Sequence, residues 1–152
     1  MDIIIGSDHA GFDLKEEVKA FLSGKQVYRV ADMGTYSTAP VDYPIVAHEV
    51  AGRVSSGEFS KGILICGSGI GMSIVANRYA KVRAALCHNL FTVKLSRLHN
   101  DANILVLGGR VLGIGLALDM VDLFLLTEFE GGRHQRRLNE IDHTKPSEGR
   151  AK

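Results

Sequence analysis

Short β-branched runs alternate along this chain with segments whose apolar residues recur at helical spacing. We expect strands at Asp2–Gly6, Val27–Ala31, Gly62–Cys66, Arg83–Cys87 and Ile104–Leu107. They are short and mostly apolar, as are strands that are buried on both faces of a parallel sheet. Strands that alternate with helices form βαβ units. The pattern therefore predicts an α/β fold, a single-domain, Rossmann-like open parallel sheet of five strands with helices on both faces.

The segments between the predicted strands carry helical stripes of apolar residues. The first stripe is Ala10, Leu14, Val18, Phe21 and Leu22, and the second is Ala47, Val50, Ala51 and Val54. Further helices are predicted from about Gly69 to Tyr79, from about Leu90 to Leu98 and from Gly113 to about Thr127.

The chain changes character near its C-terminus. The segment EGGRHQRRLNEID at 130–142 predicts a short helix outside the main core, because Leu138 and Ile141 are its only apolar residues. We expect residues 1–144 to form the domain and the polar residues 145–152 to be a disordered tail.

Composition excludes several classes of function. A length of 152 residues suits one domain with its own core, and a formal net charge of +1 offers no broad field for nucleic acid or an anionic membrane. No apolar run reaches the roughly 18 residues of a membrane span, and the N-terminus lacks a signal-peptide pattern. The sequence therefore predicts a cytoplasmic protein whose anionic ligands are bound by a local site.

Polar residues follow the predicted strands, where ligands bind in an open parallel sheet. Ser7-Asp8-His9 follow the first strand, Gly108-Gly109-Arg110 follow the fifth, and Asp42-Tyr43 precede the second helical stripe. His99-Asn100-Asp101 come just before the fifth strand, and so at its opposite end. We expect a site at the carboxyl ends of the strands, to which His99 has the least direct access.

The sequence CGSGIG at 66–71 leads from the third predicted strand into a helix. Glycines let backbone N–H groups point at an anion, and the helix adds its positive end, so the loop suits a phosphate, a carboxylate or an oxyanion. The glycines also suit a plain tight turn. The loop is a poor dinucleotide fingerprint, because its spacing is GxGxG and it does not follow the first strand, and it lacks the GK[ST] of a P-loop.

Cys66 is the reactive candidate in this loop. A helix N-terminus can lower a thiol pKa below its usual value of about 8.5, and a thiolate there can act as a base. Most free cysteines are instead small buried hydrophobic residues, and we assign Cys87 to that class. Both cysteines close apolar runs, which suits reduced thiols better than a disulfide.

Two histidines have neighbours that suit acid–base chemistry. His9 follows Asp8, and His99 precedes Asn100. A zinc site formed by Cys66, His9 and His99 is disfavoured, because no two of them have short-range ligand spacing.

A basic set completes the candidates. Arg133 and Arg137 are four residues apart and so share a helix face, while Gly131-Gly132 free the chain to turn that face toward an anion. Together with Arg110 they suit a phosphate monoester, although exposed arginines are often only solvated.

These groups together are those required to move a proton next to a carbonyl. An aldose–ketose interconversion needs a base, donors for the enediolate oxygen, and an acid–base group that opens the sugar ring. We expect no metal and no other cofactor. The predicted partner is a phosphorylated aldose or ketose.

Five ordered motifs span nearly the whole chain. They are GSDHAGFDLK at 6–15, GTYS followed by VDYP within 34–44, ILICGSGIGMSIVANR at 63–78, LSRLHNDANILVLGGRV at 95–111 and EGGRHQRR at 130–137. In these motifs the chain resembles the type B ribose-5-phosphate isomerases and the related galactose-6-phosphate and allose-6-phosphate isomerases. The resemblance implies interconversion of ribose 5-phosphate and ribulose 5-phosphate through a cis-enediolate.

The resemblance also implies a role for each candidate. Cys66 would be the base, His99 would open the ring, and Asp8 would hold sugar hydroxyls. The enediolate hole would comprise Gly67, Ser68, Gly69, Ile70 and Gly71. Tyr43 and Asn100 would line the pocket, and His9 and Arg110 would approach the phosphate. Family members share sites between two subunits, so the partner would contribute Arg133, His134 and Arg137. This implies a homodimer with shared active sites, with a dimer of dimers also open.

Three features of this chain refine the resemblance. Family members without the cysteine use a glutamate that aligns with Met72, so this chain belongs to the cysteine type. Ser68 stands where threonine is common and keeps the hydroxyl, whereas Arg136 adds a charge that leaves the sugar preference open. The alternatives are an allose- or galactose-6-phosphate isomerase, a non-catalytic sugar-phosphate sensor and a nucleotide-binding module.

Overall fold

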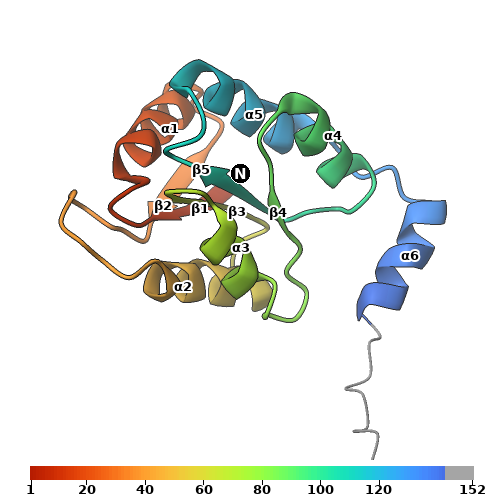
Figure 1. Cartoon of the computed structure of the whole chain (residues 1–152). Helices are drawn as coiled ribbons and strands as arrows, with labels where there is room; N and C mark the ends of the chain where they lie inside the picture. Colours follow the sequence, from red (N-terminus) through yellow and green to blue (C-terminus); the bar gives the residue numbers. More distant parts are fainter. Residues whose placement is uncertain (143–152) are drawn as a thin grey trace, which may run out of the picture.

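Five parallel strands form the centre of the molecule (Figure 1). This computed structural model describes residues 1–142, so the predicted tail at 145–152 lies outside the described residues. The strands are β1 (Asp2–Ser7), β2 (Arg29–Asp32), β3 (Lys61–Cys66), β4 (Ala84–Leu86) and β5 (Ile104–Gly108), in the order β2-β1-β3-β5-β4. The predicted α/β fold and all five strands are confirmed, with ends shifted by one or two residues.

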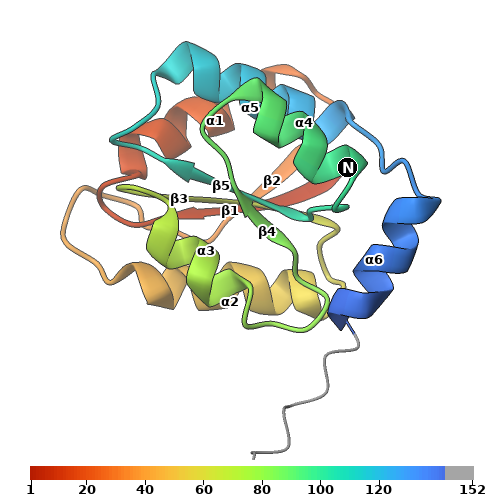
Figure 2. The same ribbon diagram turned by 45° about the vertical axis from the view of Figure 1, so that its right-hand side comes forward.

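Helices cover both faces of the sheet (Figures 1 and 2). One face carries α1 (Phe12–Gly24), α4 (Leu90–Leu98) and α5 (Ile114–Leu126), and the other carries α2 (Tyr43–Ser55) and α3 (Ile70–Ala76). The third helix is shorter than predicted, because the Asn77 side chain bonds the backbone N and O of Ala84 at 2.9 Å each. These bonds turn the chain toward β4 before Tyr79 is reached.

The direction of the chain reverses between β1 and β3. From β1 the chain crosses to β2 on one side, whereas from β3 it goes on to β4 and β5 on the other. The loops after β1 and β3 therefore diverge and leave a crevice between them, where ligands bind in such sheets. Two backbone bonds hold neighbouring loops to the end of β3: the Asp8 amide, after β1, donates to Ile65 O (3.1 Å), and the Gly109 amide, after β5, donates to Cys66 O (2.8 Å).

The last helix, α6 (Arg133–Asp142), lies beyond the end of the sheet where the strands begin (Figure 1). Leu138 is buried against the body, but Ile141 is 55% exposed, so only one of the two predicted apolar anchors docks fully. Arg97 fixes the preceding linker by donating to Thr127 O at 3.1 Å. No helix within the described residues has the length and apolarity required to cross a membrane.

A buried ion pair joins α1 to the end of β2. The Lys15 side chain is fully buried, and its ammonium lies 2.8 and 2.6 Å from the two carboxylate oxygens of Asp32. Asp32 also accepts from Lys19 and from the Gly34 amide, and so fixes the loop that leads to α2. Burial raises the pKa of Asp32, but hydrogen bonds from Lys15 and Lys19 outweigh it, so the pKa lies below the usual 3.8.

We predict that Asp32→Asn destabilises the fold by about 2 kcal/mol at pH 7, because it leaves the buried Lys15 charge with only the more exposed Glu16 carboxylate, 3.0 Å away, as an ionic partner. Since the pKa of Asp32 is lower folded than unfolded, its contribution is full above about pH 4 and is lost as pH falls through the folded-state value. Urea unfolding across pH measures both effects. The half-exposed pair Lys25–Asp122 provides the control, where Asp122→Asn should cost less than about 1 kcal/mol. Equal losses in the two variants would contradict the assignment.

Candidate active site

A cleft of about 700 Å³ lies at the carboxyl ends of β1, β3 and β5. Nine of the predicted site residues line it, namely Asp8, His9, Tyr43, Cys66, Gly67, Ser68, Ile70, Gly71 and Arg110. Gly69 lies in the same loop and is the N-cap of α3. The crevice at the β1/β3 reversal is therefore the place where these separated motifs meet.

The Cys66 thiol lies at the base of the cleft, 4% exposed and free of any disulfide. The Gly69 amide donates to its sulfur at 3.2 Å, and the Ile70 amide donates to the Ser68 hydroxyl at 3.3 Å. Gly69 has φ +80°, and a Cβ there would lie 2.4 Å from Leu86, so this turn requires glycine. The amides at the start of α3 have no acceptors within their own helix, and those of Gly69 and Ile70 are directed at the thiol and the hydroxyl that face the cleft.

Asp8 and His9 form the opposite wall. One Asp8 oxygen, Oδ1, accepts from the Ala10 and Gly11 amides at 2.9 and 3.0 Å and so holds the start of α1. Within residues 1–142, Oδ2 has no hydrogen-bonding partner and is available for a ligand hydroxyl. His9 Nδ1 lies 3.3 Å from the backbone of Val41, which leaves its Nε2 edge free.

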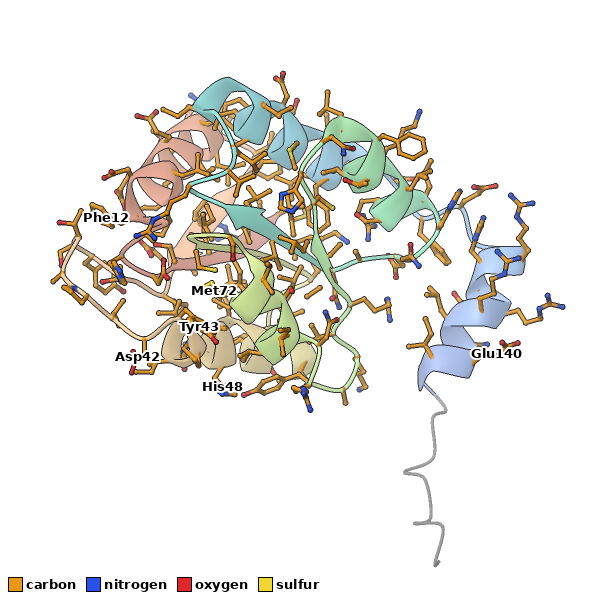
Figure 3. All side chains as sticks on the ribbon, viewed as in Figure 1. Phe12, Asp42, Tyr43, His48, Met72 and Glu140 are labelled. Carbon is orange, nitrogen blue, oxygen red and sulfur yellow. The ribbon has the colours of Figure 1, made fainter. Side chains whose placement is uncertain are left out.

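Tyr43 and Arg110 complete the cleft. Tyr43, at the start of α2, packs over Gly71, where a Cβ would lie 2.5 Å from the ring (Figure 3). Arg110 lies over Gly67, with its Nη1 atom 3.7 Å from the position of an added Cβ. Met72, the residue that marks the family's alternative base, is fully buried and is a core residue here.

The other predicted site residues lie at the opposite end of the sheet. His99 ends α4 just before β5, Asn100 lines a separate cavity of about 360 Å³, and Arg133, His134 and Arg137 belong to α6. Because β5 is five residues long, its two ends lie about 15 Å apart, and the two groups of residues are separated by that length. One chain thus assembles two separate groups of residues, and the disfavoured zinc set of Cys66, His9 and His99 does not meet within it.

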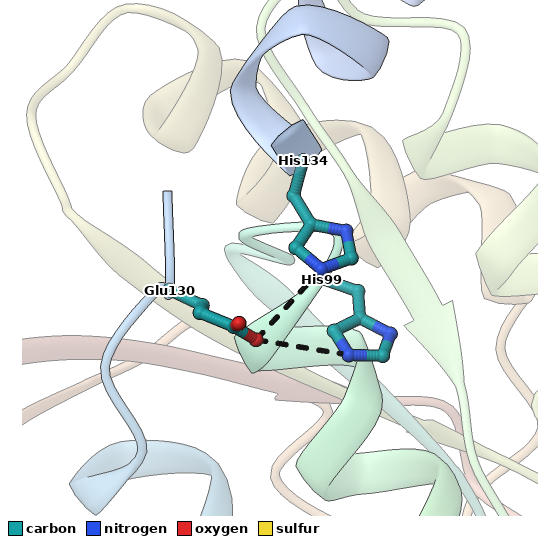
Figure 4. A group of neighbouring side chains, drawn as sticks. All are labelled: His99, Glu130 and His134. Carbon is teal, nitrogen blue, oxygen red and sulfur yellow. Dashed lines mark ion pairs between the residues drawn. The ribbon is translucent and has the colours of Figure 1, made fainter. Parts of the chain in front are cut away.

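His99 and His134 share a neighbour that sequence analysis missed (Figure 4). Glu130 Oε2 lies 3.9 Å from His99 Nε2 and 3.7 Å from His134 Nε2. These ligand atoms lie within 4.8 Å of one another, a spacing that a metal would accept. The imidazole planes are almost parallel, at 9°, so they do not direct both lone pairs at one ion, and Arg133 adds a repelling charge. The four-residue spacing of Glu130 and His134 was the sequence signal from which this contact could have been predicted.

Comparison with known proteins gives consistent matches. A family model described as Ribose/Galactose Isomerase matches residues 3–141. The chain is 48% identical over 139 residues to ribose-5-phosphate isomerase B of Escherichia coli K12, covering 91% of this chain and 93% of that protein.

Solved structures agree. Clostridium thermocellum ribose-5-phosphate isomerase B superposes with a TM-score of 0.91 at 52% identity, over 93% of this chain and 95% of that one. Mycoplasma genitalium ribose-5-phosphate isomerase B with bound ribulose-5-phosphate gives a TM-score of 0.88 at 42% identity, over 93% of each chain.

We predict that Gly71→Ala destabilises the protein by about 1–3 kcal/mol, because the added methyl group overlaps the Tyr43 ring. In a Tyr43→Ala background the same substitution should be neutral or stabilising, since alanine is the better helix former. Urea unfolding of the four proteins gives this coupling. Gly115→Ala, where no atom lies within 4 Å of the added Cβ, is the control. Additive effects at positions 71 and 43 would show that the ring does not occupy this place.

Proposed function

The chain belongs to the ribose/galactose isomerase family, and we propose that it interconverts ribose 5-phosphate and ribulose 5-phosphate. The observation that carries this proposal is the Cys66 thiol at the start of a glycine-rich helix N-terminus, inside a cleft that also holds Asp8 and Arg110. A base, oxyanion donors and a phosphate-binding cation thus lie in one cavity.

The chemistry is a proton transfer within the substrate. Cys66, as thiolate, removes the C2 proton of the open-chain aldose, and the C2–H electron pair forms the C1–C2 double bond while the carbonyl pair moves to O1. The O2 proton then passes to O1, the cis-enediolate takes the carbon-bound proton back from Cys66 at C1, and the C2 oxygen becomes the carbonyl of the ketose. Substrate and product are isomers, so the step needs no external oxidant or reductant.

The loop after β3 supports the charge that develops. Backbone N–H groups at Gly67–Gly71 and the Ser68 hydroxyl lie beside the thiol, and they stabilise an enediolate more than a neutral carbonyl. Asp8 accepts hydrogen bonds from sugar hydroxyls, and His9 and Arg110 approach the phosphate. Tyr43 closes the pocket wall against Gly71.

Ring opening requires a second set of residues. The ring oxygen leaves C1 as the C4 hydroxyl and takes a proton, which we assign to His99, while the C1 hydroxyl releases its proton to solvent and becomes the carbonyl. Because His99 lies at the far end of its own sheet, we propose that it acts in the cleft of a partner subunit in a homodimer. Asn100, Arg133 and Arg137 lie at the same end of the sheet as His99 and reach the same neighbouring cleft, where the arginines hold the phosphate.

Hexose 6-phosphates are the second candidate substrates, because the family description includes galactose and Arg136 adds a charge to α6. Rates with ribose 5-phosphate and with allose and galactose 6-phosphates, measured side by side, decide the preference.

We predict that Cys66→Ala abolishes isomerisation but leaves the affinity for a substrate analogue nearly unchanged, because the thiolate acts mainly on the transition state. Iodoacetamide should inactivate the enzyme, and bound sugar phosphate should protect it. Coupled assays and calorimetry measure turnover and binding separately. Wild-type rates in Cys66→Ala would refute the role of the thiol, whereas no turnover of any of the three sugars by the wild type would refute the function.

The shared site predicts complementation between inactive chains. When Cys66→Ala chains are mixed with His99→Asn chains and reassorted, about half the dimers are mixed and each has one intact site, so about a quarter of the activity returns. Asp8→Asn is the matched control, because Asp8 and Cys66 line the same cleft of the same chain. Mixing Cys66→Ala with Asp8→Asn should restore nothing. Recovery in the control, or none in the first mixture after confirmed reassortment, would refute the exchange.

A further inference from the structure

The rings of His99 and His134 are stacked, with centroids 4.1 Å apart and planes at 9° (Figure 4). We propose that His134 is a positioning residue that holds the His99 ring in place, rather than a contact for the substrate. This inference rests on the proposed function, in which His99 supplies the proton for ring opening. It replaces the substrate-binding role that the family resemblance implies for His134.

The His134 ring is fixed from several directions. Its side chain is 4% exposed, whereas that of His99 is 35% exposed, so His134 forms the buried support and His99 presents the accessible face. Arg133 Nε donates to His134 Nε2 at 3.3 Å, which occupies the lone pair of that nitrogen. The buried Leu138, one helical turn further along α6, holds this face of the helix against the body.

The linker before α6 keeps the two rings in register. The Glu130 amide donates to Leu98 O at 3.1 Å, next to His99, and the Glu130 carboxylate lies near the Nε2 atoms of both rings. Arg97, two residues before His99, bonds Thr127 O at the start of the same linker. The positions of His99 and His134 are therefore set together, although 35 residues separate them.

A stack of this kind requires one neutral ring. Two imidazolium rings at this separation repel by about 1 kcal/mol in water and by several times more near a protein surface. Burial, the nearby His99 and the Arg133 charge lower the pKa of His134, while Glu130 opposes them and Arg137 adds to them. These influences favour the neutral form of the His134 ring that lies against His99.

Two substitutions at one position separate support from substrate contact. His134→Phe keeps a flat ring that stacks on imidazole or imidazolium but has no nitrogen to bind a substrate. We expect its kcat and KM for ribose 5-phosphate to stay within about 3-fold of wild type, whereas His134→Ala should lower kcat by about 10-fold or more, since small misplacements of an acid are costly. If His134 contacts the substrate, both variants lose activity alike, which overturns the inference.

The pH dependence gives a second readout. Below the ordinary histidine pKa, His134 takes up a proton and the wild-type stack weakens, but phenylalanine cannot be protonated. The ratio of kcat for His134→Phe to that of wild type should therefore rise between about pH 7 and pH 5.5, and the contribution of Cys66 cancels in this ratio. A flat or falling ratio would contradict the neutral-support role.

Loss of the helix itself is controlled separately. Leu138→Ala should undock α6 and raise KM, because the arginines of the helix are displaced. A near wild-type KM in His134→Ala therefore shows that the helix is still docked and that its lower kcat comes from loss of the ring. The decision rests on His134→Phe, whose alkylation by iodoacetamide at Cys66 should match wild type. An active wild type with an inactive His134→Phe refutes this inference alone, whereas an inactive wild type refutes the proposed function.

Discussion

The parallel pairing of β1 with β3 is the constraint on which the rest of the molecule depends. These strands pair from Ile3↔Lys61 to Ser7↔Ile65, and the chain departs from them in opposite directions. Parallel pairing places the ends of both strands at one edge of the sheet, and the reversal leaves that edge open. Asp8 and Cys66, which are far apart in sequence, thereby face one cleft without any special contact between them.

The glycine-rich loop after β3 supplies backbone N–H donors at positions where a side chain would collide with neighbouring residues. A Cβ at Gly69 would strike Leu86, and one at Gly71 would strike Tyr43, so the loop approaches both neighbours as closely as packing permits. The same closeness directs the Gly69 amide at the Cys66 sulfur. In the proposed reaction, the base and the donors for the enediolate would thus belong to one turn, which would limit reorganisation during proton transfer.

The chain also carries a second cluster, at the opposite end of the sheet from its own cleft. His99 and the arginines of α6 are positioned by Arg97, the linker and Leu138 at the start of the strands, about one strand length from Cys66. In the homodimer that we propose, association of two copies would give both clusters a common substrate. Exposed apolar residues on the rim of the cleft, among them Ile70 (55%) and Ile74 (53%), suit such an interface.

The sequence by itself determined the strands, the place of the helix α4, and the cleft formed by the motifs at 6–15 and 63–78, because strand and helix periodicities and glycine turns act over short distances. It did not predict the early end of α3 at Ala76, nor the contact of Glu130 with His99 and His134. Those features depend on side chains that meet across 7 to 35 residues. Only the tertiary structure decided them, because no local pattern records which distant surfaces the packed sheet brings together.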